Sequence, residues 1–162
     1  MYDYALAQYA WQLQMLQAVS KDIDDSDFAR QPVPKGNHPA WIVGHLATSS
    51  DNLLKMLGQP VLVPEHWRPL FGRGSTPVPE REKYPLKAEL LVRLAAVHAA
   101  VAGALPSVSR EVLDRPNPIA LEQLKSLPTV GNLVMHLLTT HEAFHFGQFS
   151  AWRRAMGHAP IF

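Results

Sequence analysis

The stretch TVGNLVMHLLTTHEAFHFGQFSAWRRAM, residues 129–156, has the hydrophobic period of one long α-helix. Thr129 follows Pro128 and is a favourable N-cap, and Gly157 is suited to end the helix. At 1.5 Å per residue, such a helix is about 40 Å long. Its inward face carries polar as well as apolar side chains, namely Val134, Leu138, His141, His145, Gln148 and Trp152. The stretch therefore predicts a long amphipathic helix with two histidines directed into the protein.

Three other segments share this helical period, residues 4–19, 39–57 and 86–105, and prolines concentrate between them. The second and third segments are joined by Gln59–Pro85, which has 27 residues. A helix–helix link in a bundle normally has about 2–8 residues. Such a length allows the chain to run back along the bundle, which places helices two and three parallel, and it also suits a functional lid. We therefore expect an all-α four-helix bundle with a long crossover between helices two and three that lies near the histidines. The whole chain, residues 1–162, is predicted to form this one domain.

The composition argues against several classes of protein. The chain has no cysteine, which removes disulfides, thiolate metal sites, iron–sulfur clusters and a cysteine nucleophile, and suits a reducing compartment. Fifteen basic and fourteen acidic residues leave a net charge of +1, so nothing indicates a basic groove for nucleic acid. The N-terminal residues lack the pattern of a signal peptide, and the most apolar stretch, residues 95–105, is too short to span a bilayer. We expect a soluble, cytoplasmic protein with no nucleic-acid or membrane partner.

His141 and His145 are four residues apart, so both imidazoles lie on the same face of their helix. On a buried face an unpaired imidazole costs free energy unless something satisfies it, and a metal ion does so. His45, on the inward face of segment 39–57, is a candidate for the third nitrogen ligand. Three protein ligands with open positions are typical of a catalytic metal site. The alternative for each histidine is a hydrogen-bonded place in the core.

The other histidines are weaker candidates. His98 is expected to be buried and hydrogen-bonded. His136 precedes His141 by five residues, which places it about 140° away around an α-helix, so we expect it to face elsewhere. The remaining three are expected to be solvent-exposed, because they lie at helix ends or in loops: His38, His66 and His158.

Residues 141–145 also match HExxH, the zinc metalloprotease motif whose glutamate is the general base. Glu142 is therefore a candidate catalytic residue. The surrounding sequence disfavours a protease, because Gln148 and Ala151 stand where the extended motif has glycine and histidine, and no acidic residue follows Glu142. The alternative is a carboxylate on the exposed surface of the helix.

Two groups of residues together resemble the DinB-like superfamily of metalloenzymes: WIVGHLA at 41–47, and TVGNL, HEAFHFGQ and WRRAMG within 129–157. The resemblance covers the whole chain in helix order. It implies an up-down-down-up four-helix bundle, often a homodimer, with a divalent metal held by His45, His141 and His145. Nickel and zinc occur in the family, and three neutral imidazoles also suit Fe²⁺. Its characterised members include thiol-dependent enzymes, such as the mycothiol-dependent maleylpyruvate isomerase and bacillithiol S-transferases.

The leading interpretation is a metal-dependent enzyme of the thiol-dependent S-transferase or isomerase type. It would act on a small molecule, with a divalent metal and a low-molecular-weight thiol as cofactors. One alternative is a metal-dependent hydrolase that uses HExxH. The other is a non-enzymatic, stress-related dimer whose metal braces the bundle. Open coordination positions favour an enzyme, and a fourth protein ligand favours the structural role.

Overall fold

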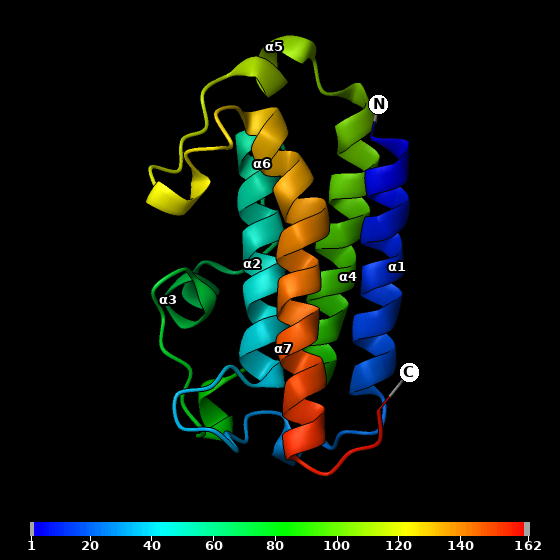
Figure 1. The fold of residues 1–162 in the computed structure, drawn as a ribbon, viewed down its shortest axis with the longest axis vertical. Coiled ribbons are helices and arrows are strands. Elements are labelled where there is room, and N and C mark those ends of the chain that lie inside the picture. Colours follow the sequence, from blue (N-terminus) through cyan, green and yellow to red (C-terminus); the bar gives the residue numbers. More distant parts are fainter. Residues whose placement is uncertain (1, 161–162) are drawn as a thin grey trace.

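The computed structural model describes residues 2–160, and its regular secondary structure is helical (Figure 1). The predicted all-α class is confirmed. Within the described residues there is no strand, and the β pairing consists of an isolated bridge between Pro116 and Thr129.

The chain has four long helical segments, which lie side by side (Figure 1). Three are single helices close to their predicted bounds: α1 (Asp3–Ser20), α2 (Pro39–Met56) and α4 (Lys87–Ala104). The fourth is continuous but has three parts: α6 (Val130–His136), the π-helical turn η6 (Leu137–His141) and α7 (Glu142–Ala155). The colours in Figure 1 show α2 and α4 starting at one end of the molecule and α1 and α7 running the opposite way. The shorter elements are the helices α3 (Arg68–Phe71) and α5 (Arg110–Asp114) and the 3₁₀ turns η1 (Asp25–Asp27), η2 (Glu65–Trp67), η3 (Arg81–Lys83), η4 (Leu105–Ser107) and η5 (Glu122–Leu124).

α2 begins at a histidine cap. The Nδ1 atom of His38 accepts a hydrogen bond from the backbone N–H of Trp41 at 3.3 Å, and Pro39 occupies the first turn, where a missing N–H costs nothing. The Nε2 atom of His38 donates to the carbonyl of Val78 at 3.0 Å, and the side chain is fully buried. The expectation that His38 is exposed is therefore wrong, because the link after α2 covers this helix end.

The link Gln59–Pro85 packs along the outer face of α2. Its Trp67 and Phe71 side chains are fully buried, and the buried Asp51 of α2 pairs with Arg68 of the link at 3.3 Å. α2 is consequently buried on nearly all sides. The link also reaches one of the histidines, since the carbonyl oxygen of Phe71 lies 2.7 Å from Nδ1 of His45.

α4 is the most apolar of the long helices. An 18-residue window within Arg81–Ser107 has a mean hydropathy of 1.6, so by length and composition alone this segment is able to cross a membrane. The shorter apolar stretch 95–105, on which the sequence-based expectation rested, is too short to do so. In the structure α4 packs against α2 and α1. Its buried stripe consists of Leu90, Leu94, Val97, His98 and Val101.

Candidate metal centre

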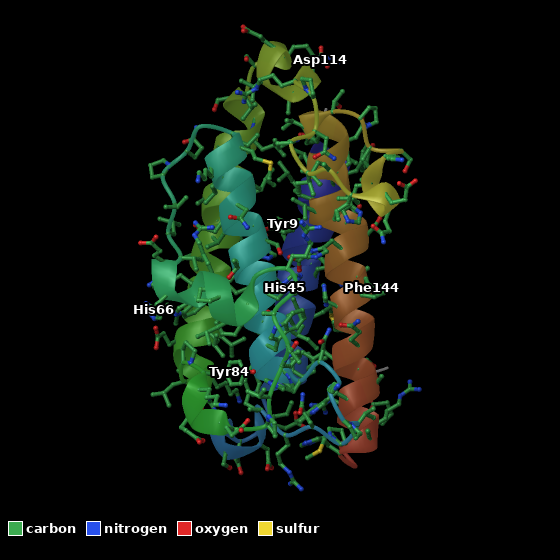
Figure 2. All side chains as sticks on the ribbon, turned by 90° about the vertical axis from the view of Figure 1, so that its left-hand side faces the viewer. Tyr9, His45, His66, Tyr84, Asp114 and Phe144 are labelled. Carbon is green, nitrogen blue, oxygen red and sulfur yellow. The ribbon has the colours of Figure 1, made fainter. Side chains whose placement is uncertain are left out.

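Three histidines converge between α2 and the fourth helical segment. His45 comes from the middle of α2, His141 ends the π-helical turn, and His145 lies in the first turn of α7. One ring nitrogen from each lies within 4.8 Å of the others, and the Nε2 atoms of His45 and His141 are 3.2 Å apart. Figure 2 shows His45 in the space between α2 and α7, whereas Phe144 lies on the outer side of α7. The structure thus brings together the three predicted ligands, although 96 residues separate His45 from His141.

Hydrogen bonds fix which nitrogen of His45 is free. Its Nδ1 lies 2.7 Å from the carbonyl oxygen of Phe71, and a carbonyl only accepts, so Nδ1 carries the proton. The Nε2 atom therefore presents a lone pair towards His141. The indole of Trp41 stacks on one face of this imidazole, with ring centroids 4.5 Å apart and planes 8° from parallel. The ring is held in the orientation that a metal ligand needs before any ion binds.

His145 is oriented by a glutamine one turn later in α7. Its Nδ1 lies 2.9 Å from Oε1 of Gln148, and the same oxygen accepts a hydrogen bond from Asn37 at 2.9 Å. An amide oxygen only accepts, so Nδ1 of His145 donates and Nε2 is free. Gln148 was placed on the inward face by the sequence, but its role as the partner of a ligand becomes visible only in the structure.

All three imidazoles are held in the neutral form. Burial lowers the pKa of His141 to about 2, with the neighbouring imidazoles His145, His45 and His136 adding to the effect. Burial, with a smaller contribution from the nearby imidazole of His45, lowers the pKa of His145 to about 4. Burial also lowers the pKa of His45. Neutral imidazole is the form that binds metal, so no proton has to be displaced at neutral pH.

The nitrogen geometry fits a small divalent ion. Two imidazole nitrogens on tetrahedral zinc, at 2.0–2.1 Å each, lie about 3.3 Å from one another. The observed separation between His45 and His141 is 3.2 Å. Within residues 2–160, no carboxylate or further histidine joins the cluster as a fourth ligand. The cluster can therefore hold a metal ion with three protein ligands.

His136 is close to the cluster, contrary to the expectation that it faces elsewhere. Its ring centroid lies 5.8 Å from that of His141. The reason is the π-helical turn Leu137–His141, because i→i+5 hydrogen bonding adds a residue to the turn and brings positions five apart onto the same side. The 140° expected for a regular α-helix does not apply across this turn. Burial lowers the pKa of His136 as well.

Glu142 is buried in the core and contacts another helix. Its side chain is 1% exposed and its Oε1 lies 3.2 Å from Nε2 of His98 on α4. The ring of His98 in turn stacks on Tyr9 of α1, with centroids 3.6 Å apart. The interpretation of Glu142 as a surface charge is therefore wrong, whereas the buried, hydrogen-bonded place expected for His98 is confirmed. The catalytic role of Glu142 stays a prediction.

Two remaining histidines lie away from the cluster. His66 is exposed, as expected. His158 is half-buried and stacks on Trp152 with ring centroids 5.8 Å apart, so the expectation of exposure holds for it only in part.

A cavity of about 610 Å³ lies beside the cluster, with His45, His136 and His141 in its wall. This volume is within the range of small-molecule sites. The cavity is bounded by α2, the link after it, the segment around residues 119–124 and α6, and Glu142 is not among its lining residues. A small molecule in this cavity can therefore reach the edge of the histidine cluster.

Sequence reasoning missed two residues that support His45. Phe71 supplies the carbonyl that orients its ring, and Gly44 makes room for Phe71: a Cβ at Gly44 would collide with the ring carbons of that phenylalanine. A glycine beside a histidine within a buried helix is the sequence signal that could have indicated this close contact.

Comparison with known proteins identifies the family of the chain. No curated protein matches the chain significantly. The sequence profile of the DinB superfamily matches residues 8–149, which include all three histidines of the cluster and most of the chain. The chain belongs to the DinB superfamily.

Proposed function

We propose that this protein is a metal-dependent enzyme that transfers or rearranges groups with the help of a low-molecular-weight thiol. The observation that carries the proposal is the position of three neutral imidazoles, two of them in the wall of a cavity and without a fourth ligand in residues 2–160. A structural metal is normally enclosed by four protein ligands, whereas a catalytic one keeps a position open. His45, His141 and His145 would hold Zn²⁺, Ni²⁺ or Fe²⁺.

A divalent ion bound there supplies Lewis acidity, which lowers the pKa of a thiol or water beside it. The chain itself supplies orientation. Phe71 and Gln148 fix the rings of His45 and His145, and Trp41 shields one face of His45 from water. The up-down-down-up arrangement of the four long helices, with which the directions in Figure 1 agree, is the scaffold that brings His45 to the other two ligands.

The hydrolase alternative is weaker. In HExxH enzymes the glutamate must reach the group that it deprotonates. Glu142 instead contacts His98 and does not line the cavity. The non-enzymatic alternative is weaker as well, because the cavity gives a small molecule access to the edge of the cluster.

The proposal extends to a cytoplasmic homodimer with no nucleic-acid or membrane partner. Residues 4–20 of α1 contain no charged side chain, although Tyr4 is 93% exposed and Trp11 is 45% exposed. Exposed aromatic side chains on an uncharged face are typical of subunit contacts. Sedimentation velocity should find a dimer that dissociates in Trp11→Glu, and a monomeric wild-type protein would contradict this part of the proposal.

The experiment that tests the activity combines metal analysis with a screen of thiols against electrophilic substrates. Wild-type protein and the exposed-site control His66→Ala should purify with stoichiometric divalent metal and conjugate at least one thiol. His45→Ala should lose both properties while still folding. Metal retention in His45→Ala, or conjugation that does not depend on metal, would refute the proposal.

A further inference from the structure

The cavity beside the histidines carries a positioned arginine. Gly72, Arg73, Gly74 and Ser75 form a tight turn, in which the N–H of Ser75 donates to the carbonyl of Gly72 at 3.0 Å. Gly74 has φ +88°, the value that a type II turn requires at its third residue and that favours glycine. The backbone of Arg73 is therefore set at the tip of the turn.

Both ends of this turn are tied to the surroundings of His45. Before it, the carbonyl of Phe71 accepts from His45. After it, the hydroxyl of Ser75 accepts from the indole N–H of Trp41 at 2.9 Å, and Trp41 is the residue stacked on His45. These contacts fix the backbone of Arg73 beside the cavity, and its exposed side chain is one of the lining residues.

The charge of Arg73 is not neutralised within the protein. Among residues 2–160, no hydrogen bond or ion pair involves its guanidinium, and no aspartate or glutamate lines the cavity. Other arginines of the link do have such partners, since Arg68 pairs with Asp51 and Arg81 pairs with Asp25. An unpaired guanidinium in an acid-free cavity is suited to a carboxylate, which it can bind through two parallel hydrogen bonds.

The rest of the wall indicates what the anion is attached to. One side is aliphatic and includes Leu124, Leu133 and Leu137. Thr48, one turn after His45 on α2, is another lining residue of the cavity; its side chain is 1% exposed and its hydroxyl has no hydrogen-bond partner among the described residues. A buried hydroxyl without a partner costs free energy, which a polar group of a bound molecule or a water removes.

We propose that the substrate of this cavity is a small organic carboxylate with an aliphatic body, bound through its carboxylate to Arg73 and through its body to the leucines. The inference rests on the proposed function only in treating this cavity as the substrate site. Arg73 thereby becomes the residue that selects anionic over neutral substrates.

The test compares hexanoate with hexanamide, a neutral molecule of nearly the same shape, by NMR chemical-shift titration of the zinc-free protein. Zinc is left out so that direct binding of the carboxylate to a metal does not contribute. The variants are Arg73→Gln, Arg73→Lys and, as a charge-matched control, Arg154→Gln in the exposed last turn of α7. Methyl shifts of Leu133 and Leu137 locate the bound molecule.

Wild-type protein and Arg154→Gln should prefer hexanoate about tenfold, the ratio that corresponds to one charged hydrogen-bonded contact. Arg73→Gln should bind both molecules equally, and Arg73→Lys should keep part of the preference. Equal binding by the wild type, absence of hexanoate binding, or a preference that survives in Arg73→Gln would overturn the inference. A separate zinc titration of the wild type distinguishes the two proposals. If the wild type prefers hexanoate but does not bind zinc, only the metal site is refuted. If it binds zinc but shows no preference for hexanoate, only the anion site is refuted.

Discussion

Replacement of Gly44 by alanine tests the connection between packing and metal affinity. An added Cβ would collide with three ring carbons of Phe71. That ring is fully buried and is packed against Trp67 and Tyr84, with centroid separations of 5.3 Å and 5.8 Å, so it cannot rotate away. The backbone of Phe71 must therefore shift, and with it the carbonyl that orients His45.

Two magnitudes follow from this collision. Overpacking a core by one methyl group costs about 1–3 kcal/mol, from which the gain of about 0.5–1 kcal/mol for alanine over glycine in a helix is subtracted. Loss of the hydrogen bond that orients a ligand typically lowers metal affinity by about 10–100-fold. Gly44→Ala should accordingly be less stable than the wild type and bind zinc more weakly.

The measurements are urea denaturation of the zinc-free protein and competitive zinc titration. Gly147→Ala is the matched control, since it is the same change in a helix, two residues after the candidate ligand His145, and its added Cβ meets no atom within 4 Å. The control should gain about 0.5–1 kcal/mol of stability and keep its zinc affinity. If Gly44→Ala behaved like Gly147→Ala in both measurements, the assignment of Phe71 as the support of His45 would be refuted.

Three further predictions concern the histidines and Glu142. Calorimetric zinc titration should find a much larger loss of affinity in His45→Ala than in His98→Ala or His136→Ala, and equal losses in all three would contradict the ligand assignment. The zinc-free protein should lose stability as the pH falls from about 6.5 to about 4, because the folded protein lowers the pKa of His141 to about 2 and that of His145 to about 4, so the unfolded chain takes up protons first. Urea denaturation at pH 7.5 and pH 5 measures this loss of stability. His141→Ala should make the stability less dependent on pH. Glu142→Gln should keep its zinc and change turnover less than tenfold, because Glu142 contacts His98 and is not among the residues that line the cavity. A decrease in turnover of about 10²–10⁴-fold in the thiol-transfer assay would instead identify Glu142 as a general base.

The sequence by itself determined the long helices and the three candidate ligands. The bounds of α1, α2 and α4 agree with prediction to within about two residues, the usual uncertainty of helix ends, because caps, prolines and apolar periodicity act locally. His141 and His145 share a helix face for the same local reason. His45 was identified because it lies on the inward stripe of its own helix.

Only the tertiary structure decided how the surroundings of the site are built. The π-helical turn that brings His136 to His141 is a departure from regular hydrogen bonding, and a period of 3.6 residues does not anticipate it. His38 is buried by the link that lies against it, and Glu142 by its contact with His98, each through a neighbour at least 40 residues away in the chain. Periodicity shows that a side chain points inward, but its partner depends on which distant segments pack there, so burial and hydrogen bonding at these positions follow from the fold as a whole.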